Sequence, residues 1–502
     1  MRSLNRWVRQ PHLLFWTAGG ISILLSLLAF FRMDAINPDG ICYLQSAATV
    51  LQQHTLALHL CDQSGWPFYQ VLIAGVSGLS GWSVMVSAGV LNAVLSALSV
   101  LMFVATVCLL TPNVRIRLWA VAVILMSHHF NAFRADIIRD HGYWAFYLMS
   151  VVALLRCVTV SDFPRRFLWA LLWAFTLTVA TLFRIEGVFF LVLCPFVVFV
   201  IPRKKIRWRT ATFFSLNALL LLILPVAVFW LILHPAHSLG RLDYLGLQIT
   251  HGWQILHGHW HQVTSAMVKV LSPFSSAEDA AVVLGTGLFG YYLLGLFDVL
   301  TPVYFVLIAY ALWRRLPGIS GVNARVLAVY IVVNVAVTLF FLAQNFFLAR
   351  RYLMGLSLIL MFWLPFALED LVRQWRVRRW PLLLAVFLMM VCALGGVWRF
   401  GPSHQYVRRA GEWLSVHASS KAAIYSNDRT VLYYAGCGNS VFVPQPSPAS
   451  IEKNELWRRY DWIALNVNPK TEINLPFVPV QVFSSARGGE IRIYRLKKEG
   501  LS

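Results

Sequence analysis

Charged residues are scarce in this chain of 502 residues, since only 13% are Asp, Glu, Lys or Arg while 59% are hydrophobic. The mean hydropathy of +0.66 lies far above that of a soluble protein. A helix needs roughly 20 apolar residues to cross a bilayer. The sequence therefore predicts a polytopic α-helical membrane protein with about eleven transmembrane helices, at 12–31, 84–110, 118–130, 143–160, 167–182, 187–201, 210–234, 286–312, 326–343, 352–370 and 380–398.

Acidic residues are half as numerous as basic ones, and the net charge of +21 raises the question of nucleic-acid binding. The placement of the charges argues against nucleic acid. Arginine and lysine gather in alternate short loops, whereas most acidic residues outside the C-terminal tail fall in the opposite loops. The positive-inside rule places the basic loops in the cytoplasm. The N-terminus is then cytoplasmic and the tail extracytoplasmic, and the first span, which has no cleavage site after it, is predicted to be retained.

Cysteine is also rare, and none of the seven residues has the spacing of a metal site. Four lie in or beside apolar spans, where a small apolar side chain explains them. Cys42 and Cys61 share the first outer loop and could pair in an oxidising compartment. The sequence does not supply the geometry that a disulfide needs, so both states stay open.

Two domains are expected, a membrane domain at 1–398 with long outer loops at 32–83 and 235–285, and an extracytoplasmic α/β domain at 399–502. Helical periodicity at 41–51, after Asn37 as N-cap, predicts a helix on the membrane surface. Residues 65–82 are interfacial or re-entrant, or else they span. In the tail, strands are predicted at 421–427, 440–445, 461–467, 479–484 and 490–496, and helices near 405–418 and 450–459.

Unusual polar side chains gather in the predicted outer loops and at the outer ends of spans. Such charges at membrane depth are costly and are usually paired or functional. Simpler explanations stay open, because a helix dipole favours an acid such as Asp39 in a first turn, Arg184 and Glu186 could pair only with each other, and Arg350 and Arg351 could reach lipid headgroups. The full set is Asp34, Asp39, Arg134, Asp136, Arg139, Asp140, His141, Arg184, Glu186, Arg350 and Arg351.

Histidines are concentrated in the loop 235–285 and just before it. An extended segment with alternate histidines could bind a metal. However, no carboxylate lies at a useful spacing, and the interfacial residues Trp253 and Trp260 favour a surface helix or loop. We predict no metal site from these residues, which are His234, His237, His251, His257, His259 and His261.

Five segments in order, "NPDGICYLQSA", "WPFYQVLIAGVSGLSGWSVMVSAGVLNAVLSAL", "IIRDHGYWAFYLMSVVALLR", "TLFRIEGVFFLVL" and "ARRYLMGLSLILMF", carry a resemblance. Together they resemble the GT-C superfamily of membrane glycosyltransferases, which includes protein O-mannosyltransferases and the lipid A aminoarabinose transferase. The resemblance covers most of residues 1–400. It implies transfer of a sugar from a polyprenyl-phosphate donor to a lipid, glycan or protein acceptor, at the outer face of the bacterial cytoplasmic (inner) membrane.

The resemblance also implies roles for individual residues. Asp39 matches the acidic residue of the first outer loop, and a carboxylate there could act as the general base that an acceptor hydroxyl needs. Arg350 or Arg351, with Tyr352, would bind the phosphate of the donor, because a guanidinium binds phosphate bidentately. The residues expected to bind or orient the substrate are Asp34, Tyr43, Arg139, Asp140, Arg184 and Glu186.

One departure concerns the first loop, where many family members carry an Asp-Glu pair but Gly40 follows Asp39. A second acid would come from Asp34, Asp62 or Asp140. We expect an inverting transferase that needs no cofactor, although aspartates at a phosphate could hold a divalent cation. The alternative is a transporter or flippase of lipid-linked sugars. Such proteins have paired repeats and broken helices, and the sequence shows no sign of either.

Overall fold

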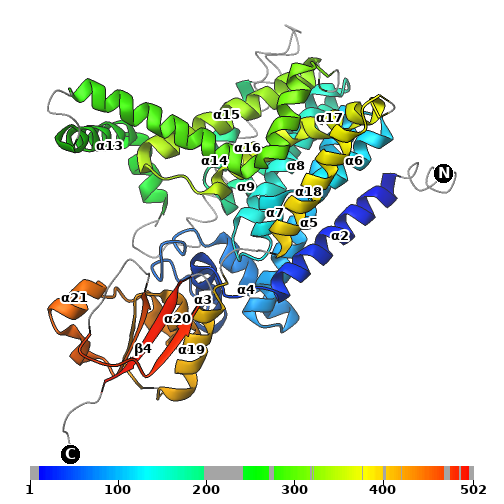
Figure 1. Ribbon diagram of the computed structural model, residues 1–502. Helices are drawn as coiled ribbons and strands as arrows, with labels where there is room; N and C mark the ends of the chain where they lie inside the picture. Colours follow the sequence, from blue (N-terminus) through cyan, green and yellow to red (C-terminus); the bar gives the residue numbers. More distant parts are fainter. Residues whose placement is uncertain are drawn as a thin grey trace, which may run out of the picture. The chain divides into compact units, whose positions relative to one another are not determined.

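The computed structural model describes residues 11–196, 241–270, 276–316, 319, 321–375, 377–398, 403–419, 421–467, 475–485 and 488–496 (Figure 1). The predicted span 210–234, the end of 187–201 and the histidines His234 and His237 lie outside these residues. The helices are α2 (Pro11–Phe31), α3 (Pro38–Gln53), α4 (Phe68–Ser80), α5 (Val84–Leu110), α6 (Val114–Leu125), α7 (His128–Phe133), α8 (Asp140–Thr159), α9 (Phe163–Phe183), α10 (Gly187–Leu193), α13 (Arg241–Val270), α14 (Ala277–Trp313), α15 (Gly321–Asn345), α16 (Arg350–Leu360), α17 (Leu364–Arg373), α18 (Trp380–Trp398), α19 (Gln405–His417), α20 (Arg429–Tyr434) and α21 (Pro448–Lys453).

The chain divides into two compact units, each assembled from segments that are distant in sequence. The helical unit comprises Met1–Ala29, Val90–Arg134 and Arg139–Trp398. The mixed unit comprises Phe30–Gly89, Ala135–Ile138 and Arg399–Ser502. The first outer loop therefore belongs with the C-terminal tail, not with the spans that flank it.

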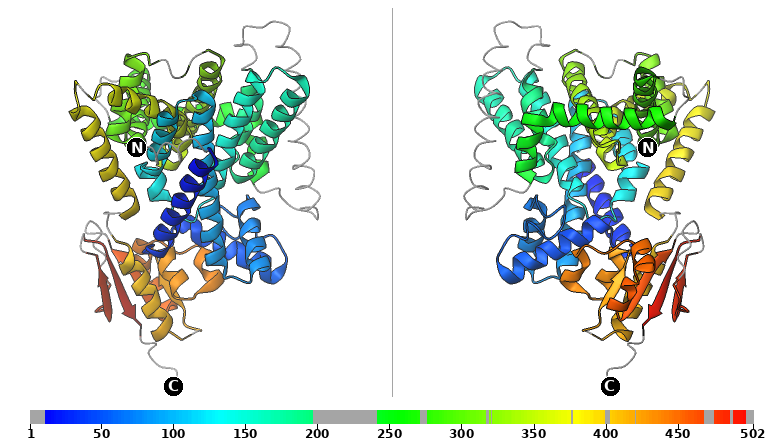
Figure 2. Two further views of the ribbon diagram at one scale, coloured as in Figure 1. Left: turned by 90° about the vertical axis from the view of Figure 1, so that its right-hand side faces the viewer. Right: turned by 90° about the vertical axis from the view of Figure 1, so that its left-hand side faces the viewer.

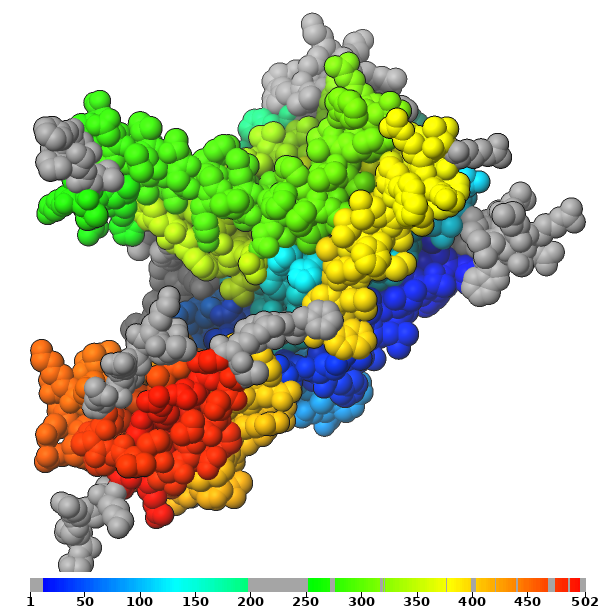
Figure 3. All heavy atoms as spheres, viewed as in Figure 1, coloured from blue at the N-terminus to red at the C-terminus, as the bar shows by residue number. Residues whose placement is uncertain are grey.

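The chain is a multi-pass membrane protein. Within its described residues, eight helices are long and apolar enough to cross a bilayer, and they correspond to eight of the predicted spans. Helix α18 illustrates the lipid-facing character of such a helix, because Leu384 is 58% and Phe387 62% exposed. In Figure 3 the α18 residues, in yellow, form part of the surface that faces the viewer. A continuous exposed apolar face of this kind suits contact with lipid rather than water.

Two short apolar segments, one of them a predicted span, have limited helical length. Helix α6 ends at Leu125, after only 12 residues, because the polar residues Ser127 and His128 interrupt the apolar run. Helix α4, within the segment 65–82, has 13 residues and is about 20 Å long at 1.5 Å per residue. That is shorter than a hydrocarbon core of about 30 Å. This length favours the interfacial or re-entrant interpretation of α4.

Helix α14 corrects one expectation, because it is a broken helix. Thr301 has φ 63° and ψ 151° in the middle of α14, and Pro302 follows it. Proline cannot donate the helical hydrogen bond, and it moves the preceding residue away from α-helical angles. A single proline in a long apolar run was not enough, at the level of sequence, to predict the break.

Hydrogen-bonded aromatic side chains form the interior where α8, α9 and α15 meet. These helices and α16 lie side by side in the helical unit (Figure 1). The hydroxyl of Tyr330 accepts a hydrogen bond from Trp173 Nε1 at 3.1 Å and shares one with Ser150 Oγ at 2.9 Å. Tyr147 packs edge-on against Tyr330, with 5.5 Å between ring centroids. Buried polar groups need such partners, so this region has one defined packing.

The tail folds around a four-stranded sheet of order β1-β2-β4-β3. β1 and β2 are parallel, whereas β2 with β4 and β3 with β4 are antiparallel. Helices α19 and α20 pack on one face through Leu414 and Val431, and α21 packs on the other through Ile451 (Figure 2). The strands are β1 (Ile424–Ser426), β2 (Trp462–Val467), β3 (Gln481–Ser484) and β4 (Glu490–Arg495).

Four of the five predicted strands are confirmed, and the strand at 440–445 is wrong. Residues Gly438–Phe442 form a 3-10 helix. Gly436 and Gly438 have φ of 76° and 53° just before it, and Pro444 follows. The glycines turn the chain, and proline lacks the N–H that a strand would donate. Val441 is therefore buried as part of a 3-10 helix and not of a strand.

The mixed unit joins the first outer loop to the tail by direct hydrogen bonds. The Ile36 amide donates to the hydroxyl of Tyr434 at 3.2 Å, and Gln45 Nε2, on α3, donates to the carbonyl oxygen of Gly438 at 3.0 Å. Gln405 Nε2 donates to Asp34 Oδ1 at 2.9 Å. Helix α3 is therefore held by residues nearly 400 positions away in sequence.

Candidate functional site

Arg184 is the centre of a buried charge cluster in the helical unit. Helix α9 ends at Phe183, Arg184 is extended, and α10 starts at Gly187. The turn is tight, because a Cβ on Gly187 would lie 2.8 Å from the backbone nitrogen of Thr181. It aims the Arg184 guanidinium at two carboxylates, and the ion pairs are formed with Asp140, at the start of α8, and with Glu186. The Arg184 and Asp140 side chains are 6% and 3% exposed.

The ionisation of Glu186 follows from this arrangement. Burial alone would raise its pKa, but the charge and hydrogen bonds of Arg184 outweigh burial and lower the pKa from 4.5 to about 2. The positive charge of Arg139 acts in the same direction. Glu186 is therefore a carboxylate at any physiological pH, and it serves as an acceptor rather than as a proton donor.

A pocket opens beside this cluster. It encloses about 400 Å³ when its open mouth is counted, and Arg184, Glu186 and Arg351 supply its charged wall. The ring of Tyr352 lies 4.4 Å from the Arg184 guanidinium and 5.5 Å from that of Arg351, within cation–π range. The remaining wall is mostly apolar and aromatic, with one amide and two hydroxyls, from Tyr143, Phe190, Asn334, Val337, Thr338 and Phe341.

The charges around the pocket sum to a positive value. In the pocket wall Arg184 and Arg351 contribute two positive charges and Glu186 contributes one negative charge, which leaves +1. Arg139 Nη1 is buried and has no hydrogen-bond partner among the described residues. A site with this charge and with guanidinium donors suits a singly charged anion, such as a phosphodiester.

The structure separates Arg350 from Arg351. Arg350 is not in the pocket wall, and its side chain, 63% exposed, pairs with Asp298 of α14. His129 Nε2 lies 3.9 Å from the same carboxylate. Consecutive helical residues point about 100° apart, so only one of the two arginines can face the pocket from the first turn of α16.

Two other polar residues of the segment 133–144 have structural partners inside the helical unit. Arg134 is 3% exposed, and its Nη1 donates to Ser22 Oγ at 3.0 Å and to Ser26 Oγ at 2.6 Å on α2. His141 is fully buried between Ser96 Oγ, at 3.0 Å, and the Phe133 carbonyl oxygen, at 3.1 Å. These contacts fix helices to one another and do not reach the pocket wall.

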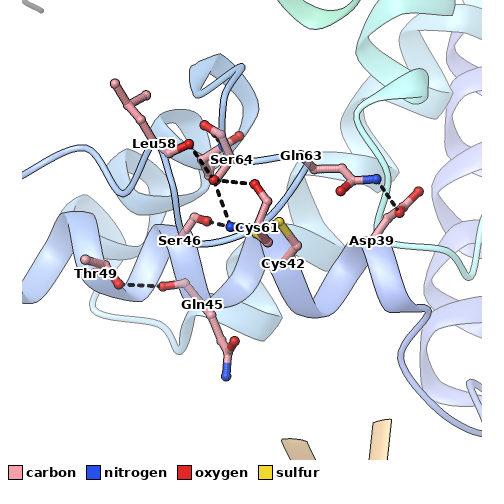
Figure 4. Close-up of a disulfide and its surroundings, with 10 residues drawn as sticks. Asp39, Cys42, Gln45, Ser46, Thr49, Leu58, Cys61, Gln63 and Ser64 are labelled. Atoms are coloured by element: carbon pink, nitrogen blue, oxygen red, sulfur yellow. Dashed lines mark hydrogen bonds between the residues drawn. A yellow bond between two sulfur atoms is a disulfide. The ribbon is translucent and has the colours of Figure 1, made fainter. Parts of the chain in front are cut away.

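Asp39 lies in the mixed unit, in the first turn of α3, behind the predicted N-cap Asn37 and Pro38. Its Oδ1 accepts a hydrogen bond of 2.7 Å from Gln63 Nε2 (Figure 4). The Asn37 side chain does not cap the helix, because Oδ1 accepts from the Ile137 amide at 2.9 Å and Nδ2 donates to its carbonyl oxygen at 3.3 Å. The segment 135–138 is thereby fastened to the start of α3.

This fastening explains the glycine after Asp39. A Cβ on Gly40 would lie 2.7 Å from Asn37 Oδ1 and 3.0 Å from Ile137 Cβ. Distances under 3.0 Å are not compatible with ordinary packing. A glutamate at position 40 does not fit this arrangement, so the second acid of an Asp-Glu pair is excluded by crowding.

The remaining sequence-predicted residues of the first loop have defined surroundings. Asp34 is half-buried and accepts the hydrogen bond from Gln405. Tyr43 is 2% exposed and packs edge-on against Tyr69, with 5.0 Å between ring centroids. Cys42 and Cys61 form a disulfide, with their Cα atoms 6.1 Å apart. The structure thus answers the question that the sequence left open for these cysteines.

Comparison of the fold with solved structures gives several similar proteins. An oligosaccharyltransferase from Archaeoglobus fulgidus, in complex with Zn and sulfate, matches with a TM-score of 0.58 and 11% identity over 90% of this chain and 68% of that chain. ArnT from Cupriavidus metallidurans, bound to undecaprenyl phosphate, matches with a TM-score of 0.58 and 12% identity over 95% of this chain and 97% of that chain. The chain has the GT-C fold.

A third similar structure is the Archaeoglobus fulgidus oligosaccharyltransferase AglB in complex with an inhibitory peptide and a dolichol-phosphate, with a TM-score of 0.58 and 11% identity over 92% of this chain and 70% of that chain. No protein-family model matches the sequence, and no curated protein matches it. At such low identity the GT-C fold is what the likeness establishes. One fold supports many chemistries, so the reaction must be argued from the site.

Metal ligands are not clustered in the part of the chain that the structure describes. No group of three or more His, Cys, Asp or Glu side chains there is arranged to hold a metal ion. His257 and His261 lie on the long helix α13, with 5.8 Å between their ring centroids. Residues 241–270 are thus helical, which is one of the two forms that the sequence left open, and they are not an extended segment.

Sequence reasoning missed two uncharged residues of the pocket wall. Asn334 Nδ2 donates to the hydroxyl of Tyr147 at 2.5 Å and lies in the apolar helix α15. Thr338, one turn later, shares a hydrogen bond with Tyr292 at 2.9 Å. An amide and a hydroxyl four residues apart in a membrane helix share one face, and this spacing was the signal that could have identified them.

Proposed function

We propose that this protein is a glycosyltransferase that moves a sugar from a polyprenyl-phosphate donor to a lipid, glycan or protein acceptor. The observation that carries the proposal is the pocket in the helical unit, whose wall combines the guanidiniums of Arg184 and Arg351 with aromatic and aliphatic side chains. A donor of this class combines a phosphodiester with an apolar chain. Support also comes from similar structures that were solved with undecaprenyl phosphate and with dolichol-phosphate.

In the proposed reaction the sugar is transferred from donor to acceptor in a single displacement that inverts the anomeric carbon. The acceptor oxygen forms a bond to the anomeric carbon, while the bond from that carbon to the phosphate oxygen breaks. The leaving polyprenyl phosphate gains one negative charge. Arg184 and Arg351 stabilise this charge, because fixed donors aimed at developing charge lower the barrier. Arg350 is a weaker choice for this role, since it is paired with Asp298.

Asp39 is the proposed general base that takes the proton of the acceptor hydroxyl. Asp39 lies in the first turn of α3, a short helix in the first outer loop. Arg139, Asp140 and Glu186 are proposed to position Arg184 and the donor, with Asp34 and Tyr43 holding the first loop. Each role rests on geometry within its own unit.

The proposed setting is the bacterial inner membrane, with the N-terminus cytoplasmic. Residues 1–398, with loops 32–83 and 235–285, would form the catalytic domain, and 399–502 an extracytoplasmic domain. No cofactor is proposed, and addition of EDTA to the assay below distinguishes this from a requirement for a divalent cation at the phosphate.

The test is turnover by the purified protein. Detergent-solubilised protein is incubated with a panel of undecaprenyl-phosphate monosaccharides and an extract of cell envelope as acceptor, and released undecaprenyl phosphate is measured. We expect release by the wild type and a loss of at least about 100-fold in Asp39→Asn, the usual contribution of a general base. Wild-type turnover in Asp39→Asn, with normal folding, would exclude Asp39 as the base.

A second candidate function is transport of lipid-linked sugars, which the broken helix α14 favours, since transporters place such breaks at their binding sites. The same assay distinguishes the two. A transporter binds the donor without cleaving it, so it would release no undecaprenyl phosphate from any member of the panel.

A further inference from the structure

The amide of Gln63, in the first loop, donates a hydrogen bond to Asp39. Gln63 Nε2 lies 2.7 Å from Asp39 Oδ1, and both side chains are half-buried (Figure 4). The two residues are 24 positions apart. A glutamine side chain has several freely rotating bonds and loses much conformational entropy when it is held in one place. The hydrogen bond is therefore strong only if the loop around Gln63 is itself rigid.

The loop is rigid, because the chain is held on both sides of Gln63. Two residues before it, Cys61 is bonded to Cys42 of α3, one helical turn beyond Asp39. On the other side, Ser64 is 1% exposed, and its Oγ donates to the carbonyl oxygens of Leu58 at 2.9 Å and Cys61 at 2.6 Å. The Ser64 amide also donates to the Cys61 carbonyl oxygen at 2.9 Å. The turn 61–64 is thus closed on itself.

The disulfide connects this closed turn to the helix that carries Asp39. It links residues 19 positions apart, and such a link reduces the number of conformations that the intervening chain can adopt. Cys42 is 1% exposed and lies on the same helix as Asp39, only three residues later. The disulfide therefore limits how far the Gln63 amide can move from the Asp39 carboxylate.

We propose that Gln63 is a positioning residue for Asp39 and that the Cys42–Cys61 disulfide is the support that keeps it in place. The Gln63 amide donates to Oδ1 and fixes the rotation of the carboxylate, so that its oxygens face one direction. Reduction of the disulfide lets the turn move relative to α3, and the Gln63 amide then no longer holds Oδ1 in one place. This inference rests on the proposed function, and it adds that turnover depends on the redox state of the first loop.

The test begins with Gln63→Leu, which keeps the size of the side chain and removes the donor. A hydrogen bond to a charged group is worth roughly 1.5–3 kcal/mol, so kcat should fall by about 10-fold or more. The KM for the undecaprenyl-phosphate sugar that the wild type turns over fastest should stay unchanged. The matched control is Gln52→Leu, at an exposed glutamine near the end of α3, and it should retain wild-type turnover.

A double-mutant cycle separates positioning from general loss of structure. Cys42→Ala/Cys61→Ala should lower kcat to a similar extent, as should dithiothreitol added to the wild type. Adding Gln63→Leu to the double alanine variant should cost little more, since residues that act through one interaction are not additive. Elution as a single species in size-exclusion chromatography verifies that each variant is folded.

Each failure has its own signature. Wild-type kcat in Gln63→Leu, a loss confined to KM, or fully additive losses in the cycle would overturn the positioning role while the proposed function stands. Absence of undecaprenyl phosphate release by the wild type, with every donor in the panel, would overturn the proposed function and this inference with it.

Discussion

Replacing Arg184 by methionine removes the positive charge from a site where two carboxylates converge. Asp140 is only 3% exposed at its side chain and would be left as an uncompensated buried charge, whereas Glu186 is 24% exposed and keeps some contact with solvent. Breaking a buried ion pair on one side costs about 3–5 kcal/mol. For a chain of this length we expect the midpoint of thermal unfolding to decrease by roughly 5 °C.

The neutralised triple variant Arg184→Met, Asp140→Asn, Glu186→Gln should recover most of this loss, because polar or apolar replacements of a whole buried ion cluster are often nearly neutral. Arg408→Met is the matched control. It breaks the exposed pair with Glu412, where the two side chains are 46% and 48% exposed, and such pairs contribute about 1 kcal/mol or less.

The assay is heating of the detergent-solubilised protein, followed by size-exclusion chromatography of the fraction that stays monodisperse. Both Arg184 variants should also lose transfer activity, since the guanidinium is absent in each. A midpoint for Arg184→Met equal to that of Arg408→Met would refute the view that this cluster is electrostatically tight. Failure of the triple variant to recover would show that packing, rather than unpaired charge, is responsible.

Two further predictions concern the same unit. The pKa of Glu186 is lowered from 4.5 to about 2 in the folded state, so its ionised form stabilises the fold above pH 4.5, and this stabilisation is lost as the pH falls toward 2. The difference in unfolding midpoint between wild type and Glu186→Gln should therefore be constant from pH 5 to 8 and shrink below pH 4.5. Gly142→Ala should destabilise the protein by about 1–3 kcal/mol, because the added Cβ would overlap the ring of Phe183, whereas Gly290→Ala, which meets nothing within 4 Å, should be neutral or stabilising; equal midpoints for the two alanine variants would contradict the packing.

The membrane helices could be predicted because their signal is local. A run of about 20 apolar residues is sufficient by itself, and eight of the predicted spans have their counterparts among the described helices. Failures occurred where backbone conformation decides. The break at Thr301 depends on one proline in a long helix, and residues 440–445 turn because of two glycines that precede them.

The candidate site was predicted only in part, for a similar reason. Charged residues stand out in an apolar sequence, so Asp140, Arg184, Glu186 and Arg351 were identified. Their interaction partners could not be predicted, because the sequence does not show in which direction each side chain points. Arg134 turns towards α2, while Arg351 and not Arg350 faces the pocket. No sequence pattern marked Gln63, because amides are common in polar loops. Only the 2.7 Å hydrogen bond to Asp39 in the structure identifies it.

The assembly of the mixed unit has a consequence for the order in which this protein matures during synthesis. The cysteines of its disulfide are 19 residues apart and can pair early, whereas the bond from Ile36 to Tyr434 spans 398 residues. At roughly 5–20 residues per second, the ribosome needs about 20–80 s to make that stretch. Until all the later spans have been made, α3 can be cross-linked by its disulfide, but Ile36 before it lacks the hydrogen bond to Tyr434. A chain that ends after the last span, at residue 398, but before residue 434 has all its described spans and lacks the tyrosine that binds Ile36.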